Sequence, residues 1–310
     1  MSNPIDVAVI GGGPAGLTAG LYAARGNART VIFERALWGG QITTTDHVEN
    51  YPAFPEGISG AQLGELMYRQ ATAHGAQVQQ FVDITALDRL ESGIFELTSE
   101  YETYQARCVI LATGAVPSRL GIPGEEHYTG RGVSWCATCD AAFYRQKVVA
   151  VIGGGDAAVE EALFLTRFAR HVYLVHRRDE FRATAVLVDR AHDADSLEIV
   201  TPYIPVEIKG DGSKVTALVI ESATDRASRE LGVDGVFEFV GVRPQNTLAS
   251  ELLAPDARGY IATAPDGSTT VPGLFGAGDL TKGPLKQVVT AASAGAIAGF
   301  SALHYLDARN

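Results

Sequence analysis

Val9-Ile10-Gly11-Gly12-Gly13-Pro14-Ala15-Gly16 decides the fold of this chain. The same pattern returns as Val151-Ile152-Gly153-Gly154-Gly155-Asp156-Ala157-Ala158, at a constant offset of 142 residues. Each copy follows an apolar run and precedes a helical pattern. In such a unit a buried strand enters a tight glycine turn, and a dinucleotide pyrophosphate rests on the N-terminus of the next helix. The sequence therefore predicts two dinucleotide-binding units.

The residue at the end of the second strand of each unit indicates which ribose is bound. Under the same offset Glu34 aligns with His176. A glutamate accepts hydrogen bonds from ribose hydroxyls and repels a 2′-phosphate, so the first site is predicted to take FAD or NAD. His176 is followed by Arg177, Arg178 and Arg182, whose charge-assisted donors suit a phosphate and predict NADP. A solvated basic turn is the alternative interpretation of these residues.

The bulk composition describes a globular chain. Its 310 residues are 46% hydrophobic and 20% charged, enough for two domains with separate cores. The net charge of −11 argues against nucleic acid or an anionic membrane as a partner. No segment resembles a signal peptide, and no apolar run reaches the roughly 18 residues of a membrane span. With three cysteines the chain suits a reducing compartment, and we expect it to be cytoplasmic.

Two of the cysteines form the pattern Cys136-Ala137-Thr138-Cys139, just before the second copy. This spacing places both sulfurs on one turn, close enough for a disulfide, and a helix N-terminus there would lower a thiol pKa toward about 7. Zinc, and any other metal, is not expected, because a structural zinc site needs four ligands. Cys108 lies in an apolar run and reads as a buried strand residue. Two dinucleotides and a dithiol together suggest an electron path.

The pattern along the chain predicts the order of elements. Residues 4–35 read as strand, helix and strand, a helix is expected near 60–74, and alternating segments over 77–104 indicate a small antiparallel meander. Residues 108–111 read as a buried strand. Further strands are expected near 197–222 and 236–240, and a final helix over about 286–305.

The predicted class is α/β, with two Rossmann-like three-layer dinucleotide-binding domains, the second inserted in the first. Residues 1–116 and 245–310 are predicted to form a discontinuous FAD-binding domain. Residues 117–244 are predicted to form an NADPH-binding domain that carries the Cys-x-x-Cys pattern. The crossings near residues 116 and 244 are candidate hinges.

These motifs resemble those of the low-molecular-weight thioredoxin reductases, a branch of the two-dinucleotide flavoprotein disulfide reductases. The likeness covers almost the whole length. Its most specific part is Cys136-Ala137-Thr138-Cys139-Asp140, placed before the second fingerprint. Other landmarks are Gly39-Gly40-Gln41, Asn50-Tyr51-Pro52, Ala112-Thr113-Gly114, His176 to Arg182 and Gly276-Ala277-Gly278-Asp279.

The resemblance implies two sets of cofactor-binding residues. FAD would be held by Gly11, Gly13, Pro14, Ala15, Gly16, Glu34, Gly40, Gln41, Asn50, Ala112, Thr113, Gly114, Gly278, Asp279, Lys286 and Gln287. NADPH would be held by Gly153, Gly155, Asp156, Ala158, His176, Arg177, Arg178 and Arg182.

The resemblance also implies catalytic roles. Electrons would pass from NADPH through the flavin to the Cys136–Cys139 disulfide and on to the disulfide of thioredoxin or a thioredoxin-like protein. Cys139 would face the flavin, Cys136 would attack the partner, and Asp140 would donate and accept a proton. A homodimer and a rotation between the two domains are implied in the same way.

Three positions differ from the usual pattern of that family. Lys286 stands where an arginine is common, and lysine keeps the charge but loses the planar fork. Ala141 stands where a glycine often follows the Cys-x-x-Cys pattern. Asp156 stands where a neutral residue is common, and an acid near a phosphate needs a countercharge.

Two other functions remain open. One is an NAD(P)H-dependent flavoprotein reductase that serves a peroxiredoxin or a glutaredoxin-like partner. Such relatives usually carry an additional N-terminal thioredoxin-like module, and the first fingerprint here begins near Val7. The other is a ferredoxin or flavin electron-transfer relative, or a nucleotide-sensing module, without disulfide turnover. The presence of Cys136 and Cys139 favours disulfide reduction over this last class.

Overall fold

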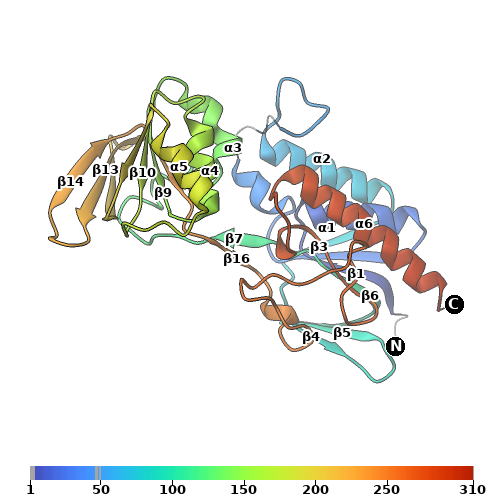
Figure 1. Cartoon of the computed structure of the whole chain (residues 1–310). Helices are drawn as coiled ribbons and strands as arrows, with labels where there is room; N and C mark the ends of the chain where they lie inside the picture. The colour runs from blue at the N-terminus through green and yellow to red at the C-terminus, as the bar shows by residue number, and fades with distance from the viewer. Residues whose placement is uncertain (1–3, 46–47, 49, 310) are drawn as a thin grey trace. The chain divides into compact units, whose positions relative to one another are not determined.

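The computed structural model describes residues 4–45, 48 and 50–309. The chain divides into two compact units (Figure 1). Unit 1 comprises Met1–Val116 and Arg243–Asn310, and unit 2 comprises Pro117–Val242. The second stretch of unit 1 thus begins two residues before the expected position 245.

Unit 1 is built on a seven-stranded sheet with the order β3-β2-β1-β6-β5-β4, and β17 pairs with β6. Its strands are β1 (Ile5–Ile10), β2 (Thr30–Glu34), β3 (Gln77–Gln80), β4 (Ile84–Arg89), β5 (Phe95–Ser99), β6 (Thr103–Leu111) and β17 (Leu274–Gly276). β1 pairs in parallel with β2 and β6, and β17 is parallel to β6. The carboxyl ends of β1, β6 and β17 therefore meet at one edge, where the first glycine turn lies.

The expectation of an antiparallel meander over residues 77–104 is wrong for its first strand. β3 runs parallel to β2, with Val31 opposite Gln77 and Glu34 opposite Gln80. Only β4, β5 and the start of β6 pair antiparallel. Residue alternation carries no information on strand direction. The helix α2 (Gly60–Ala73) lies between β2 and β3 and makes the crossover that a parallel pair requires.

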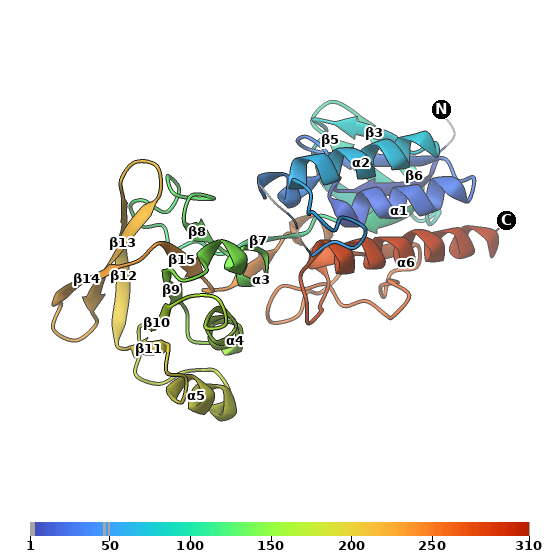
Figure 2. The ribbon, with the colours of Figure 1, turned by 90° about the horizontal axis from the view of Figure 1, so that it is seen from above.

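Three helices cover one face of this sheet. In Figure 2, α1 (Pro14–Arg25) lies between α2 and α6 (Val288–Asp307). The contact of α1 with α6 is close because α6 presents glycines there. A Cβ on Gly295 would come within 2.1 Å of the Ala15 carbonyl oxygen, and one on Gly299 within 2.5 Å of that of Ala19. The other face of the sheet packs Phe33, Phe95 and neighbouring apolar residues into a second core.

The final helix is also notable for its composition. By length and hydropathy, α6 is the one described helix that could cross a bilayer, and 28% of its most apolar window is buried inside the structure. Its alanine and glycine face packs on α1, as the core helix of a globular domain does.

Unit 2 has three layers. Its central sheet has the order β11-β10-β9-β15-β8, and all these pairs are parallel. The strands are β8 (Val133–Ser134), β9 (Val148–Ile152), β10 (His171–Val175), β11 (Leu197–Val200) and β15 (Gly235–Glu238). The helices α3 (Ala137–Asp140), α4 (Asp156–Leu165) and α5 (Ala185–His192) lie over one face (Figure 1). The antiparallel sheet of β12 (Tyr203–Gly210), β13 (Val215–Ser222) and β14 (Ser228–Gly232) covers the other.

The two crossings between the units pair with each other. β7 (Ala115–Pro117) and β16 (Val242–Pro244) form a two-stranded sheet. The predicted α/β class with two Rossmann-like units is confirmed.

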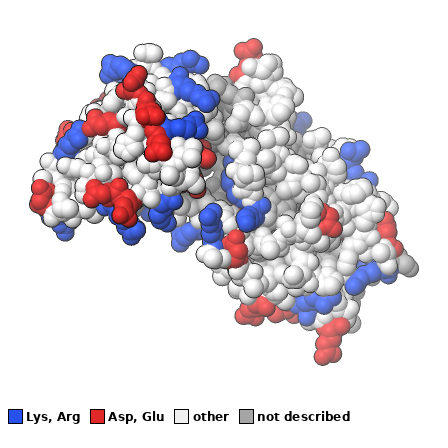
Figure 3. All heavy atoms as spheres, viewed as in Figure 1, with Lys and Arg blue, Asp and Glu red and all other residues white. Residues whose placement is uncertain are grey.

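On the face drawn in Figure 3, acidic and basic side chains are interspersed on both units and form no single-sign patch.

Candidate active site

The first glycine turn is shaped by contacts that admit no side chain. Gly11 has a φ of +109°, and a Cβ there would lie 2.3 Å from the carbonyl oxygen of Ala112. A Cβ on Gly16 would lie 1.8 Å from the carbonyl oxygen of Gly11. The N-cap of α1 is Gly13, and no side chain caps this helix end. The first N–H groups of α1 are therefore available to an anion such as a pyrophosphate.

The structure brings the other predicted segments of unit 1 to this turn. The backbone N–H of Gly39 donates to the carbonyl of Gly12 at 2.8 Å. A Cβ on Gly40 would lie 3.0 Å from the Cα of Gly13, and one on Gly278 would lie 2.8 Å from the Cβ of Ala15. These segments therefore pack directly against the first glycine turn, and their glycines permit the close contact.

Glu34 ends β2 and is 9% exposed. Its Oε2 accepts the backbone N–H of Gly12 at 2.6 Å, and its Oε1 accepts that of Ala36 at 2.9 Å. A carboxylate has about four acceptor positions, so two remain for ribose hydroxyls.

Asp279 and Lys286 form the polar end of the unit 1 site. Burial raises the pKa of Asp279, and the Lys286 charge opposes that shift. The Lys286 ammonium donates to the carbonyl oxygens of Thr281 at 2.5 Å and Asp279 at 3.3 Å, and it lies 4.6 Å from the Tyr260 ring centre. Burial lowers the pKa of Lys286. The sequence does not predict Tyr260 as a site residue, because no pattern in the neighbouring residues indicates that it contacts Lys286.

Three other predicted residues lie in the same part of unit 1. The amide of Gln41 donates to the carbonyl of Ala115, and Asn50 Nδ2 donates to Gln287 Oε1 at 3.0 Å. Thr113 Oγ1 donates to the carbonyl of Gln245 at 2.5 Å. Side chains from both stretches of unit 1 thus hold the loops around the first turn.

The second glycine turn leaves an open space. Its helix, α4, has Gly155 as N-cap with no side-chain cap, and a Cβ on Gly155 would meet no atom within 4 Å. The Asp156 carboxylate does not stand alone beside this opening. Its Oδ1 accepts the backbone N–H of Thr184 at 2.7 Å. This contact holds the carboxylate through a neutral backbone donor, and it is not the countercharge that the sequence predicts for Asp156.

The basic segment that follows β10, residues 176–182, is hydrogen-bonded to the second glycine turn. The backbone N–H of Arg182 donates to the carbonyl of Gly154 at 2.7 Å. The side chains of Arg177, Arg178 and Arg182 are exposed, and none forms an ion pair with any residue the structure describes. Three exposed arginines on a segment that is hydrogen-bonded to the second glycine turn offer guanidinium donors for a multiply charged anion.

His176 lies at the base of this segment. It is 8% exposed, and its ring occupies the space that a Cβ on Gly154 would need. Burial lowers its pKa, and the charges of Arg177, Arg178 and Arg182 lower it further. Its Nε2 is buried without a hydrogen-bond partner among the described residues. The ring also donates a hydrogen bond to the backbone of Glu180, so Nε2 of the neutral imidazole is an acceptor that fits a ligand hydroxyl.

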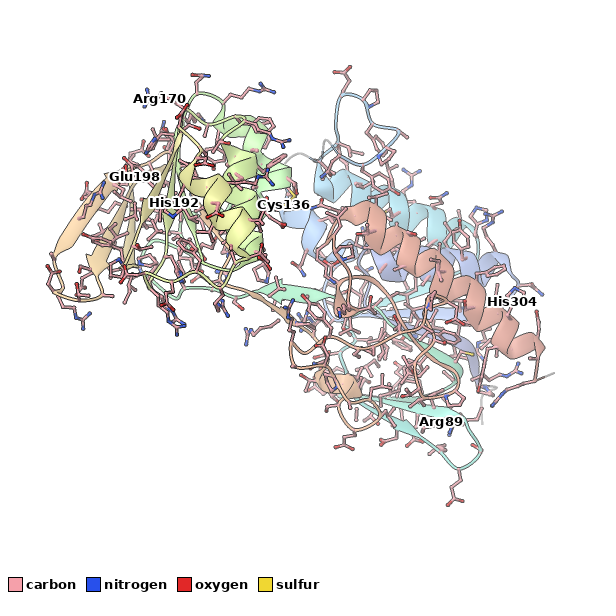
Figure 4. All side chains as sticks on the ribbon, in the orientation of Figure 1. Arg89, Cys136, Arg170, His192, Glu198 and His304 are labelled. Atoms are coloured by element: carbon pink, nitrogen blue, oxygen red, sulfur yellow. A yellow bond between two sulfur atoms is a disulfide. The ribbon has the colours of Figure 1, made fainter. Side chains whose placement is uncertain are left out.

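Cys136 and Cys139 form a disulfide in unit 2. Cys136 is the N-cap of α3 and is labelled in Figure 4. Its Sγ accepts the backbone N–H of Cys139 at 3.2 Å and lies 3.3 Å from the Thr138 hydroxyl. Both cysteines are half-buried, as is Asp140. The disulfide is therefore accessible at one end of a helix turn.

The third cysteine, Cys108, is not part of the disulfide. Cys108 is buried in β6, and burial raises the pKa of its thiol to about 12. Within the described ranges no group of three or more His, Cys, Asp and Glu side chains is placed to hold a metal.

Comparison with known proteins places this geometry in a family. Residues 5–295 match the family model described as pyridine nucleotide-disulphide oxidoreductase. The chain belongs to this family. The match runs through both glycine turns and the disulfide, so it covers every part of the candidate site.

Individual relatives are similar over the full length. The chain is 44% identical to a thioredoxin reductase of Helicobacter pylori, over 98% of this chain and 99% of the relative. It is also 44% identical to a bifunctional thioredoxin reductase/thioredoxin of Mycobacterium leprae, over 97% of this chain and 66% of that longer one. The crystal structure of thioredoxin reductase from Streptococcus pyogenes aligns with a TM-score of 0.92 and 40% identity, covering 99% of this chain and 100% of that one.

Proposed function

We propose that this protein is a thioredoxin reductase that uses NADPH as electron donor and FAD as its flavin. The family and its thioredoxin reductase members imply a flavin and a nicotinamide nucleotide. The observation that carries the proposal is the Cys136–Cys139 disulfide, half-buried at the start of a helix turn in the same unit as the second glycine turn.

The choice of cofactors rests on the two ribose-end residues. Glu34 holds negative charge beside the first turn, which suits the free ribose hydroxyls of FAD and disfavours a 2′-phosphate. The three exposed arginines offer donors and positive charge beside the second turn, and His176 adds a buried ring nitrogen there, which suits NADPH. When bound, the two cofactors supply the two electrons that reduce the disulfide.

The chemistry of the protein residues then follows from thiol–disulfide exchange. Reduction breaks the S–S bond and leaves one thiolate and one thiol. The N–H of Cys139 donates to the Sγ of Cys136 and stabilises negative charge on that sulfur. The Cys136 thiolate attacks the partner disulfide, forms a mixed disulfide and releases one partner thiolate. Cys139 then attacks Cys136, releases the second partner thiolate and restores the internal disulfide.

Asp140 is placed to serve the proton steps. It follows Cys139 directly on α3, and its negative charge contributes to the raised pKa of Tyr144. A half-buried carboxylate next to the dithiol can take the proton of the attacking Cys139 thiol and pass it to the departing partner thiolate.

The proposed partner is thioredoxin or a thioredoxin-like protein in the cytoplasm. A peroxiredoxin or a glutaredoxin-like protein is the alternative substrate. The decisive experiment is NADPH-driven reduction of a panel of these disulfide proteins by the purified enzyme. Thioredoxin should have the highest kcat/KM, and a peroxiredoxin or glutaredoxin-like protein as the best substrate would overturn the choice of partner.

We further propose a homodimer formed through unit 1. Large apolar side chains remain exposed on α6 and α1, including Phe300 at 56%, Ile297 at 41% and Tyr22 at 41%. A groove beside them is lined by residues such as Met67 and Val289. Sedimentation should show a dimer, and Phe300→Glu should shift it toward monomer. A monomeric unmutated protein at micromolar concentration would contradict this part.

A further inference from the structure

Two glutamates of unit 2 are buried outside the site described above. Glu125, in the loop before β8, is 2% exposed, and Glu238, the last residue of β15, is 1% exposed. Burying an ionised carboxylate is costly unless hydrogen bonds or opposite charge compensate it. Neither residue forms an ion pair within the described part of the chain. Burial and hydrogen bonds together therefore decide their protonation.

One oxygen of each carboxyl group is engaged. Glu125 Oε2 accepts the backbone N–H groups of Gly121 at 2.5 Å and Ile122 at 3.3 Å. Glu238 Oε2 accepts the indole N–H of Trp135 at 3.1 Å. The Oε1 atoms of both glutamates are buried, and neither accepts a hydrogen bond from a described donor. A side-chain hydrogen bond between the two carboxyl groups is among the causes that raise the pKa of Glu238.

These two unpaired oxygens complement each other only if one of them carries a proton. Ionised carboxylates are acceptors and cannot bond to each other, whereas an acid and a carboxylate form a short, strong hydrogen bond. We propose that Glu125 and Glu238 share a single proton between their Oε1 atoms at neutral pH, and that this pair positions Trp135 and the segment leading into Cys136. Its role in positioning Cys136 rests on the proposed disulfide-reductase function.

The surroundings indicate which residue carries the proton. Glu125 accepts two backbone N–H groups, which stabilise its charge, so the proton belongs to Glu238. Burial raises the pKa of Glu238 to about 8, and the charge of Glu125 contributes to this shift. The Trp135 hydrogen bond and Arg119 oppose it. The adjacent strand β9 contributes no titratable side chain.

The pair is connected to the disulfide through the chain itself. Trp135 lies between Ser134 and Cys136, and its ring lies 5.2 Å from the guanidinium of Arg119. The backbone N–H of Cys136 donates to the Ser134 hydroxyl at 3.1 Å. The indole and the serine thus fix Cys136, the N-cap residue of α3. Loss of the shared proton leaves two repelling carboxylates and weakens this attachment.

The first experiment detects the protonated carboxyl group of Glu238. In a Trp38→Phe background Trp135 is the remaining tryptophan, so its fluorescence reports the carboxyl that its N–H contacts. The oxidised holoprotein should show a fluorescence step with a midpoint near pH 8. Infrared difference spectra across that step should show the loss of one protonated carboxyl. Glu238→Gln should remove both signals, because the amide can still donate to Glu125 and accept from Trp135 but does not ionise.

Two further variants test whether the fluorescence step belongs to this pair of glutamates. Glu125→Gln should move the step to lower pH, because the neighbouring negative charge is gone. Glu126→Gln, an exposed neighbour, is the matched control and should leave the step unchanged. A step that persists in Glu238→Gln, or no infrared signal of a protonated carboxyl at neutral pH, would overturn the shared proton.

The positioning role is measured on the reduced protein. The alkylation rate of Cys136 should change slope with pH near the same midpoint, and Glu238→Gln should lack this change while it keeps a reactive thiol. An identical pH profile in the two proteins would overturn the positioning role. Because the spectroscopic step needs no thioredoxin, failure of thioredoxin reduction with an intact step would contradict the proposed function alone.

Discussion

The backbone N–H of Gly12 donates a hydrogen bond of 2.6 Å to Oε2 of Glu34. At the equivalent place in unit 2, a Cβ on Gly154 would lie 2.2 Å from Cε1 of the His176 ring. The middle glycine of each turn therefore packs against the residue at the end of the second strand of its unit. In our proposal, the exchange of an acid for a base followed by arginines changes which dinucleotide suits the site.

The first prediction concerns nucleotide preference. Arg177→Ala combined with Arg178→Ala should raise the KM for NADPH about a hundredfold, because each of the two lost charge-assisted contacts costs on the order of 1.4 kcal/mol, or about tenfold. The constants for NADH should change little. Arg170→Ala, an exposed arginine outside this segment, is the control. Steady-state kinetics with both nucleotides checks this, and equal use of both by the unmutated enzyme would contradict it.

The second prediction concerns the flavin. The purified protein should be yellow and should release FAD, not FMN, on denaturation. Gly12→Ala should lower the FAD content, because the added Cβ would lie 2.9 Å from the Cβ of Glu34. Gly232→Ala, where a Cβ meets no atom within 4 Å, should keep full occupancy. Chromatography of the released cofactor measures both, and equal loss in the two variants would remove the link to the turn.

The third prediction separates the two cysteines. Cys139→Ser should accumulate a stable mixed disulfide with thioredoxin, because Cys136 attacks and no thiol resolves the adduct. Cys136→Ser should block thioredoxin reduction while NADPH still reduces the flavin. Mass spectrometry of the trapped adduct identifies the attacking sulfur. An adduct that forms only through Cys139 would reverse the two roles.

The fourth prediction concerns stability against pH. Between the ordinary pKa of 4.5 and the folded value of about 8, folded Glu238 holds a proton that the unfolded chain has released. The free energy of unfolding should therefore fall as pH rises through this window and should level off above it. Glu238→Gln should show a smaller fall, and Glu126→Gln should follow the unmutated protein. Urea titrations of the oxidised protein over this range measure the slopes; equal slopes for Glu238→Gln and the unmutated protein would contradict this linkage.

The fifth prediction is a rotation between the units. The disulfide and the His176 segment both belong to unit 2, whereas the proposed flavin site belongs to unit 1. One bound flavin must exchange electrons with both, so we expect two states that interconvert through the β7 and β16 crossings. Spin labels at Glu91→Cys and Arg170→Cys should give two distances whose populations change with NADPH. A single distance under all conditions would exclude the rotation.

Much of the candidate site could be predicted because its signals are local. The glycine turn around Gly11, which has a positive φ, is a pattern of consecutive residues, and so is the Cys-x-x-Cys spacing. The strand before each turn and the helix after it follow from apolar runs of ordinary length. Helix ends were predicted less well, since α6 covers 288–307 where 286–305 was expected.

Short runs of consecutive residues are enough to specify the two glycine turns, the acid and base that distinguish them, and the dithiol between them. Tertiary structure alone decided that β3 is parallel to β2, that Asp156 bonds to the backbone of Thr184, and that Trp135 meets Glu238 across 103 residues. The physical reason is that strand direction and buried hydrogen bonds depend on segments distant in the chain. A local sequence pattern therefore does not predict which hydrogen-bond donor a buried carboxylate contacts in the folded protein.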